Sequence, residues 1–460
     1  MESRRKKHPA APSALFLVSL GCSKNLVDTE VIAGTLLSAG RTLAFDPEEA
    51  DLYVINTCAF LPAAREEAFA AIREGIEWKR AAEGRRLVVS GCLTEWDKTG
   101  EVRKNFPEVD LWTGVNQTAK LAELLDSDAA PAPAGAPCYL YDETTPRLQL
   151  TLPHLAYLKI ADGCNNRCTY CSIPGIRGTL RSRSIASVTE EARNLIRGGV
   201  RELLVIAQDI TAFGMDRPES GENLQLLLEA LNNLDGDFVI RLLYTHPAHY
   251  TPELIDFLAR PDTKVLPYLD IPLQHISDRI LRAMNRHVTR EEVETLLATL
   301  RRRIPDLTLR TTFITGFPGE SEEEFEELQA FARKFRFERC GVFPYSAEPG
   351  TPAAKLPGQI PQELAEARAT KLMKQQLARM KRANKALEGK EFRVLIDEID
   401  GHVAIARGPM DAPEIDNVIA IPKPARLREG EFCQVRIIGT DGYDLIAEPV
   451  HSAKKGAKHA

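Results

Sequence analysis

Two long runs of alternating apolar strands and helices set the fold class of this 460-residue chain. In the first run, ALFLVSLGC (14–22), DLYVINTCAF (51–60) and RRLVVSGCL (85–93) read as continuous apolar strands, with helical stretches at 26–40 and 62–84. Continuous apolar strands that alternate with helices are typical of a parallel sheet covered on both faces. The first ~125 residues therefore predict an α/β domain.

The same alternation resumes at residue 152 and continues to about residue 360. We expect six strands here, which are LAYLKIA, ELLVIAQ, FVIRLLY, KVLPYLDIP, LTLRTTFITGF and CGVFPYS. Helices are expected between them, at 188–198, 222–233, 252–260, 277–284, 289–302 and 321–335. Six such units predict a partial, TIM-like (β/α)6 barrel rather than a closed eight-fold one.

Changes in composition divide the chain into domains. An Ala-, Pro- and Gly-rich run after residue 125 indicates a linker. The Lys- and Arg-rich stretch 362–388 predicts one long helix, which we interpret as a solvated connector. After residue 391, short strands separated by Gly, Pro and Asp predict a small antiparallel β-barrel. The expected order is an N-terminal domain at 12–126, a linker at 127–150, a partial barrel at 151–386 and a C-terminal domain at 387–450.

Composition excludes several classes of protein. The chain is 44% hydrophobic and 27% charged, and its formal net charge is −6, unlike a protein that coats nucleic acid. It shows no secretory signal and no apolar stretch near the ~18 residues that cross a bilayer. We therefore expect a cytoplasmic protein without membrane contact. In that reducing compartment its nine cysteines indicate metal binding or redox chemistry rather than disulfides.

Three of the cysteines, Cys164, Cys168 and Cys171, stand within eight positions as C-x3-C-x2-C. They follow the first strand of the expected barrel and so belong to its C-terminal face, where barrel active sites are built. Structural zinc is one alternative, but it takes four ligands, usually as two local pairs, and this loop offers three. Three thiolates fit a cubane iron–sulfur cluster whose fourth iron is left open to another ligand.

Cys22, Cys58 and Cys92 form a second, dispersed set, in SLGC, NTCAF and SGCL. Each follows an apolar strand, so a parallel sheet places all three at one edge, where α/β proteins collect ligands. Three thiolates converging there again indicate a cluster with an open iron. Three unrelated strand-end cysteines are the alternative. We interpret the other cysteines as small hydrophobic side chains, namely Cys138, Cys340 and Cys433.

The C-x3-C-x-aromatic-C loop, with Tyr170 as the aromatic residue, resembles that of the radical S-adenosylmethionine (SAM) enzymes. With the N-terminal cysteine set and the small C-terminal barrel, the chain from about 13 to 450 resembles the methylthiotransferases of that group. The resemblance implies two 4Fe–4S clusters, one that binds SAM and one that carries the sulfur to be transferred. It also implies that the last domain is a TRAM domain, an OB-like substrate-binding barrel. No side chain is then expected as a catalytic acid or base, because the clusters and SAM carry the chemistry.

Two branches of that family differ in substrate. MiaB-like members modify an adenosine of tRNA, and RimO-like members modify an aspartate of the small-subunit ribosomal protein twelve. Three stretches resemble the second branch, namely SLGCSKNLVDTE (19–30), VIAQDITAFGMD (205–216) and GPMDAPEIDNVI (408–419). The resemblance thus implies methylthiolation of the β-carbon of that aspartate, with tRNA as the alternative substrate.

The charge of the last domain favours the protein substrate independently. Residues 391–450 contain twelve Asp and Glu against six Arg and Lys. An RNA-binding barrel should be basic, because phosphate neutralisation dominates affinity for RNA, whereas an acidic barrel suits a basic ribosomal protein. A solvated acidic face with no partner is the alternative. The resemblance also implies an electron donor such as flavodoxin or ferredoxin.

The resemblance implies five SAM contacts. Tyr170 is expected against the adenine. Gln208 follows the second barrel strand, where many radical SAM enzymes carry a Gly-Gly-Glu that this chain lacks, and Gln274 ends the fourth strand, within reach of the ribose. In the fifth-strand stretch RTTFITGFPGE, Ile314 is expected near adenine and Arg310 at the SAM carboxylate. A purely structural role is the alternative for the last four.

Two other function classes are the alternatives to this reading. An iron–sulfur electron-transfer or scaffold protein would supply four protein ligands to each cluster, whereas each set here has three. A nicotinamide-dependent dehydrogenase would carry G-x-G-x-x-G after a strand, and the sequence has none. Both are disfavoured.

Overall fold

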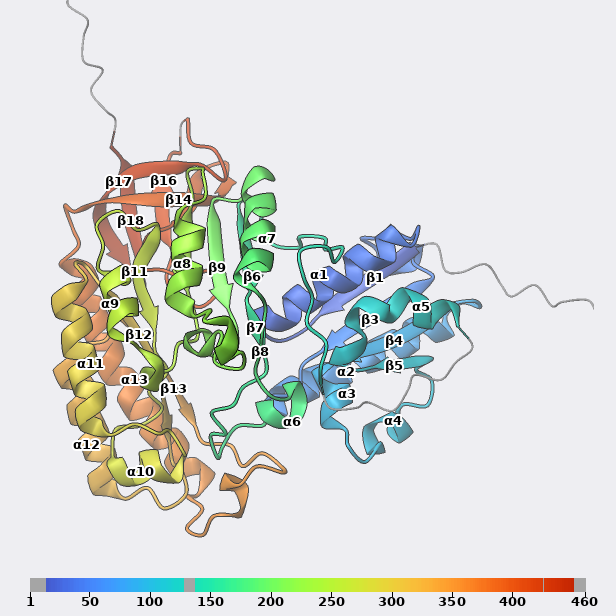
Figure 1. Ribbon diagram of the computed structural model, residues 1–460, viewed down its shortest axis with the longest axis horizontal. Coiled ribbons are helices and arrows are strands. Elements are labelled where there is room, and N and C mark those ends of the chain that lie inside the picture. The colour runs from blue at the N-terminus through green and yellow to red at the C-terminus, as the bar shows by residue number, and fades with distance from the viewer. Residues whose placement is uncertain (1–13, 128–136, 425, 451–460) are drawn as a thin grey trace, which may run out of the picture.

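The computed structural model describes residues 14–127, 137–424 and 426–450, whose strands form three main sheets and one two-stranded ribbon (Figure 1). Residues 128–136 of the predicted linker, and residues 12–13 at the start of the predicted N-terminal domain, lie outside this range. No helix in the described ranges is long and apolar enough to cross a membrane.

The N-terminal sheet is parallel throughout, as predicted, with strand order β2-β1-β3-β4-β5. Its strands are β1 (Ala14–Ser19), β2 (Thr42–Leu43), β3 (Leu52–Thr57), β4 (Arg86–Gly91) and β5 (Leu111–Thr113). Its helices are α1 (Ser23–Ser38), α2 (Pro62–Arg80), α3 (Cys92–Trp96), α4 (Glu101–Asn105) and α5 (Leu121–Asp126). Every residue of β3 is buried, because apolar cores lie on both faces of the sheet.

The second sheet has six parallel strands in the order β13-β12-β11-β10-β9-β6 and does not close, which confirms the partial barrel. Its strands are β6 (Leu155–Lys159), β9 (Glu202–Ile206), β10 (Val239–Leu242), β11 (Val265–Asp270), β12 (Thr308–Thr315) and β13 (Arg339–Pro344). A two-stranded ribbon, β7 (Ala161–Asp162) with β8 (Arg181–Ser182), follows β6. The main apolar core lies between this sheet and its helices.

The α-helices of this part are α6 (Ile173–Arg177), α7 (Ile185–Arg197), α8 (Leu224–Asn232), α9 (Pro252–Leu258), α10 (Asp278–Ala283), α11 (Arg290–Arg303), α12 (Glu322–Phe335) and α13 (Gln362–Lys385). The short 3-10 helices of the chain are η1 (Pro47–Glu49), η2 (Val115–Lys120), η3 (Ile210–Ala212), η4 (Pro218–Ser220), η5 (Pro247–His249) and η6 (Ala353–Lys355).

The solvated connector interpreted at 362–388 is corrected by the structure. Helix α13 packs against β12 and β13. It buries Ala365 and Leu372, and its Arg368 pairs with buried Glu320 at 2.7 Å. Most of the apolar positions on its buried face are alanines, so the sequence carries only a weak amphipathic signal there.

The last sheet is a closed five-stranded barrel in the order β14-β15-β16-β18-β17. Its strands are β14 (Glu391–Asp400), β15 (Val403–Arg407), β16 (Ile419–Pro422), β17 (Phe432–Asp441) and β18 (Asp444–Pro449). Four pairings are antiparallel, and the pairing of β16 with β18 is parallel. An odd number of strands cannot close with every neighbour antiparallel, so one parallel seam is required.

Buried ion pairs attach the two outer sheets to the central one, which lies between them in Figure 1. On the barrel side, Arg407 pairs with Glu202 at 2.5 Å. Arg339 pairs there with Asp411. On the N-terminal side, Asp28 of α1 pairs with Arg177 of α6 at 2.5 Å.

The part of the predicted linker that the structure describes, residues 137–150, is not a free tether. Tyr141 is buried and donates to Glu191 at 3.1 Å. Arg147 pairs with Glu30 at 2.6 Å and with Glu191 at 2.5 Å, so it joins the N-terminal domain to helix α7. These aromatic and charged residues follow the Ala- and Pro-rich run. Their contacts explain why residues 137–150 pack against the domains although the composition predicted a linker.

Candidate functional site

The loop that carries Cys164, Cys168 and Cys171 follows β7 at the carboxyl end of β6. Its entry requires glycine, because Gly163 has φ +79° and a Cβ there would lie 2.1 Å from the Thr179 carbonyl oxygen. A backbone N–H from Thr169 to the Met284 carbonyl, at 3.0 Å, ties the loop to the end of α10. The position of the loop is thus fixed by the tight turn at its start and by the hydrogen bond to α10.

The dispersed cysteines converge, as their strand-end positions predict. Cys22 follows β1, Cys58 follows β3, and Cys92 opens α3 after β4, and these three strands are neighbours in the sheet. A Cβ on Gly21, whose φ is +91°, would lie 2.8 Å from Sγ of Cys58, so the turn before Cys22 lies directly against Cys58.

All six cysteines line a single cavity of about 840 Å³ between the N-terminal sheet and the carboxyl end of the six-stranded sheet. Cys58 and Cys92 are buried, whereas Cys22 is open to the cavity. Tyr170, Gln208 and Gln274 line the same cavity. Two thiol sets that are more than 70 residues apart in sequence therefore face one space.

The spacing of the thiols distinguishes a cluster from a zinc ion. Among the described residues, the one group with three or more potential ligand atoms within 4.8 Å of one another is Asp209, His246 and His249. Neither cysteine set is that compact. A zinc ion with Zn–S bonds near 2.3 Å would hold its sulfurs about 3.8 Å apart. Wider spacing suits a cubane, in which each thiolate binds a different iron.

One buried arginine serves each thiol set. Arg177 donates to Sγ of Cys92 at 3.2 Å and to Asp162 at 3.2 Å. Arg286 donates to Sγ of Cys168 at 3.6 Å and to the Pro272 carbonyl at 2.5 Å. Fixed cations beside the sulfurs favour their thiolate form, which is the form that binds iron.

The thiol pKa values show opposing effects of burial and charge. Burial raises the pKa of Cys92 to about 12, although Arg177 opposes this shift. Burial likewise raises the pKa of Cys164 to about 11 and that of Cys171 to about 12. At Cys22, burial is outweighed by the charges of Lys24 and Arg177, and its pKa lies below the ordinary value.

Two glutamines present buried, unpartnered oxygens at this cavity. Nε2 of Gln208 donates to Asp162 at 2.8 Å, which leaves its Oε1 without a partner. Gln274 has φ +70° and a likewise unpartnered Oε1. A buried acceptor without a donor is costly, so both oxygens fit a ligand with N–H or O–H groups. The amine and the ribose hydroxyls of SAM are such groups.

Two predicted SAM contacts are not among the residues that line the cavity. Arg310 pairs with Asp270 at 2.9 Å and lies 3.6 Å from Asp416 of the C-terminal barrel, so its charge is already matched. Ile314 packs against the same small apolar cluster as Tyr170, and its N–H donates to the Gln274 carbonyl at 2.7 Å.

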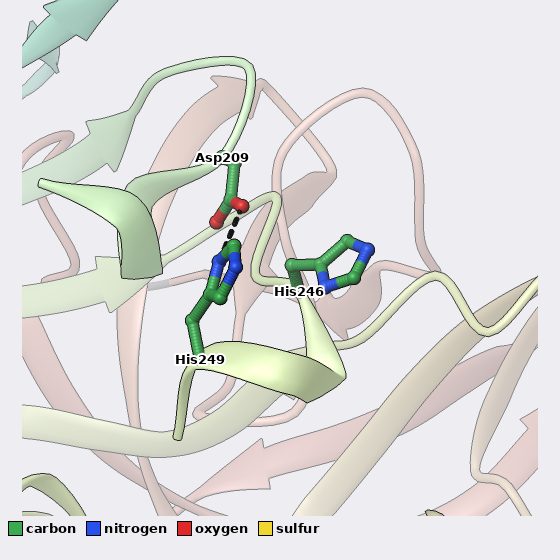
Figure 2. A group of neighbouring side chains, drawn as sticks. All are labelled: Asp209, His246 and His249. Atoms are coloured by element: carbon green, nitrogen blue, oxygen red, sulfur yellow. Dashed lines mark hydrogen bonds and ion pairs between the residues drawn. The ribbon is translucent and has the colours of Figure 1, made fainter. Parts of the chain in front are cut away.

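Sequence reasoning missed Asp209, His246 and His249 as a group (Figure 2). His249 donates to Asp209 at 2.9 Å, as does Asn166 at 2.7 Å, and Thr211 donates to the other carboxylate oxygen. The Ala248 N–H donates to Nδ1 of His246. The Asp209 carboxylate and Nδ1 of each histidine are thus in use within the protein, and we assign no metal to this group.

His246 offers a hydrogen-bond donor to the cavity that it lines. Its Nδ1 accepts from the Ala248 N–H at 3.2 Å, so the proton of the neutral ring lies on Nε2, which is buried without a partner. Burial and the nearby charge of Arg286 lower the pKa of His246 to about 2, so the ring stays neutral. The sequence signal that could have identified these residues is the pair of histidines in THPAHY, directly after a barrel strand.

Comparison with known proteins finds matches over most of the chain. The chain matches the model of the radical SAM superfamily at residues 158–332, that of the uncharacterized protein family UPF0004 at 14–114, and that of the TRAM domain at 389–450. Among solved structures, the radical SAM methyltransferase TsrM from Kitasatospora setae, with cobalamin and a [4Fe-4S] cluster bound, shares the fold. Its TM-score is 0.55 at 14% identity, over 74% of this chain and 76% of that one.

Relatives of much higher identity extend over almost the full length. The ribosomal protein uS12 methylthiotransferase RimO of Akkermansia muciniphila is 43% identical over 95% of this chain and 100% of its own. That of Carboxydothermus hydrogenoformans is 43% identical over 94% of this chain and 98% of its own. The chain therefore belongs to the RimO family of ribosomal protein uS12 methylthiotransferases.

Proposed function

We propose that this protein transfers a methylthio group to the β-carbon of an aspartate of ribosomal protein uS12, with two 4Fe–4S clusters and SAM as cofactors. The observation that carries the proposal is the single cavity lined by both thiol sets. Radical formation and sulfur delivery must reach the same substrate carbon, and one shared space permits this. The name that the full-length relatives carry gives the same substrate.

The two thiol sets take separate roles in this proposal. Cys164, Cys168 and Cys171 hold the cluster that binds SAM, beside Tyr170. The other set, Cys22, Cys58 and Cys92, holds the cluster that presents sulfur. When bound, these groups supply radical chemistry that removes hydrogen from an unactivated carbon, together with the sulfur that replaces it.

The protein's own side chains position these groups. Oε1 of Gln208 and Oε1 of Gln274 accept hydrogen bonds from SAM and fix its orientation. Arg177 and Arg286 hold Cys92 and Cys168 by charge-assisted hydrogen bonds. Arg310 is already paired with Asp270, and the arginine that lines the cavity beside Tyr170, at 3.4 Å, is Arg286.

The C-terminal barrel is proposed as the contact for uS12, a basic protein. Part of its acidity is internal, because Asp411 pairs with Arg339, and Asp416 accepts from Tyr268 at 2.5 Å. Eight of the twelve carboxylates and five of the six bases belong to exposed residues, so the surface retains an acidic excess. Reduction of the clusters is assigned to a flavodoxin or ferredoxin. The predicted domain boundaries, 12–126, 151–386 and 387–450, remain our working division.

The proposal is tested by reconstituting the full chain anaerobically with iron and sulfide and supplying SAM and a reductant. Purified uS12 is offered in one reaction and unmodified tRNA in a second. We expect uS12 to gain the mass of a methylthio group that replaces one hydrogen, and tRNA to stay unchanged. Methylthiolated adenosine in the tRNA digest, with uS12 unchanged, would make the tRNA alternative correct.

A further inference from the structure

Lys24 is a buried lysine in the shared cavity that forms no ion pair with a carboxylate of the described residues. It lies two residues after Cys22 in α1, is 8% exposed and lines the cavity. Buried lysines are usually paired with a carboxylate, whereas the acidic side chain whose charge acts on Lys24 from its own turn is the Cys22 thiol. A buried cation that faces an open cavity is suited to bind an anion that enters it.

The position of Lys24 is fixed by Tyr244, which lies just after β10. Nζ of Lys24 lies 3.3 Å from the centroid of the Tyr244 ring, and the Tyr244 hydroxyl lies 3.4 Å from Oγ of Ser23. Tyr244 has φ +64°, a conformation that costs free energy in a non-glycine residue and is concentrated at functional sites. The ring contacts the ammonium group from one side. The N–H groups of the ammonium form no ion pair with a carboxylate of the described residues.

The other two cations that line the cavity already donate hydrogen bonds to groups of the protein. Arg177 has Asp28 at 2.5 Å and Asp162 at 3.2 Å. Arg286 donates to the Pro272 carbonyl at 2.5 Å and lies beside Cys168. Lys24 is therefore the cation best able to accept a new anionic partner, and it belongs to the side of the cavity that carries Cys22.

We propose that Lys24 binds the side-chain carboxylate of the target aspartate. This inference rests on the proposed function and specifies how its substrate is selected. The β-carbon is directly bonded to the carboxyl carbon, so a carboxylate bound by Lys24 keeps the reacting carbon within the cavity that both thiol sets line. The unpartnered Nε2–H of His246 is a second donor in the same cavity. Lys24 is thus a specificity residue for a carboxylate-bearing side chain.

A double-mutant cycle on binding tests the proposal without turnover. The dissociation constant of reconstituted enzyme is measured for uS12 and for uS12 whose target aspartate is changed to asparagine. The unmodified enzyme should prefer the aspartate form by on the order of 10–100-fold, as expected for a buried charge pair. Lys24→Met should lose most of that preference, and Lys24→Arg should retain part of it. Lys120→Met, at an exposed lysine of the same domain, is the matched control and should behave as the unmodified enzyme.

Each other outcome has a distinct meaning. The inference is overturned if Lys24→Met keeps the preference for the aspartate form, or if it weakens the binding of both forms of uS12 equally. In either case, methylthiolation of uS12 by the unmodified enzyme leaves the proposed function intact. If Lys24→Met loses iron from the N-terminal thiol set alone, Lys24 serves the cluster, and the inference that it binds the substrate carboxylate is overturned. An unmodified enzyme that neither binds nor modifies uS12 overturns the proposed function itself, and this inference with it.

Discussion

Arg177, the last residue of α6, donates a hydrogen bond of 3.2 Å to Sγ of Cys92, which lies 85 residues earlier and opens helix α3 of the N-terminal domain. The same guanidinium pairs with Asp28 of α1 and with Asp162 after β6. A single side chain of the central domain therefore both joins the N-terminal sheet to the rest of the protein and places a positive charge at its thiol set.

Replacing Arg177 should weaken this junction. Arg177→Gln leaves Asp28 and Asp162 with less compensation in a buried site, which typically costs about 3–5 kcal/mol. All three tryptophans lie in the N-terminal domain, at 78, 96 and 112, so their fluorescence during chemical denaturation reports the unfolding of this domain alone. Arg80→Gln is the control, because its pair with Glu108 is largely exposed and should cost below about 1 kcal/mol. Equal unfolding curves for both variants would contradict the assigned role of Arg177.

Iron content should divide between the two thiol sets. The reconstituted protein should bind about eight irons per chain, and Cys22→Ala/Cys58→Ala/Cys92→Ala should bind about four, as should the variant with all three loop cysteines replaced. Cys138→Ala/Cys340→Ala/Cys433→Ala is the matched control and should retain about eight irons. Metal analysis by mass spectrometry decides, and zinc in place of iron would be incompatible with the proposed clusters.

The C-terminal barrel should lose its attachment in acid. Burial alone would raise the pKa of Glu202, but Arg241 and Arg407 lower it below its ordinary value. A carboxylate with a depressed pKa in the folded state stabilises the fold above its unfolded pKa of about 4.3, and this contribution is lost as pH falls through the folded pKa.

Glu202→Gln should therefore melt below the unmodified protein near pH 7, and the difference should shrink below about pH 4. Thermal melts followed by circular dichroism across this range measure it. Glu448→Gln, in an exposed pair with Arg436, should differ little from the unmodified protein at every pH. A Glu202→Gln difference that is constant with pH would show that the carboxylate charge does not stabilise the junction.

Charge reversal on the barrel should weaken the capture of uS12. Glu398 and Asp400 are exposed on β14. Glu398→Lys/Asp400→Lys should slow association with uS12 at low ionic strength, and the difference should fade in high salt, because such steering is screened. Glu219→Lys/Asp235→Lys, two exposed positions on the central domain, is the control. Biosensor association rates at two salt concentrations compare the variants, and equal rates would place the uS12 contact elsewhere.

Local patterns in the sequence were sufficient to predict the sheets and the positions of both thiol sets within them. Parallel strands end at one edge, so Cys22, Cys58 and Cys92 had to converge once their strands were identified. The closed barrel followed from short strands and turn residues in the same way. These features depend on periodicity within a few residues, which a single sequence displays directly.

Contacts between distant residues were not visible in the sequence. Arg310 stands at the motif position expected for a SAM contact, yet Asp416, 106 residues later, approaches its guanidinium from the C-terminal barrel. The buried face of α13 combines alanines with polar side chains and a single leucine, so it shows little apolar periodicity although the helix packs against β12 and β13. Lys24 is a single charge in an ordinary helix, and only the fold shows that it faces a cavity and has no carboxylate partner among the described residues.

The most direct test of the central claim follows a hydrogen atom. The reconstituted enzyme is given SAM, a reductant and uS12 that carries deuterium on the β-carbon of its aspartates, and the released 5′-deoxyadenosine and the modified peptide are analysed by mass spectrometry. We expect deuterium in the deoxyadenosine, in proportion to the methylthio groups on the target aspartate. Deoxyadenosine free of deuterium, formed while uS12 becomes modified, would contradict the account.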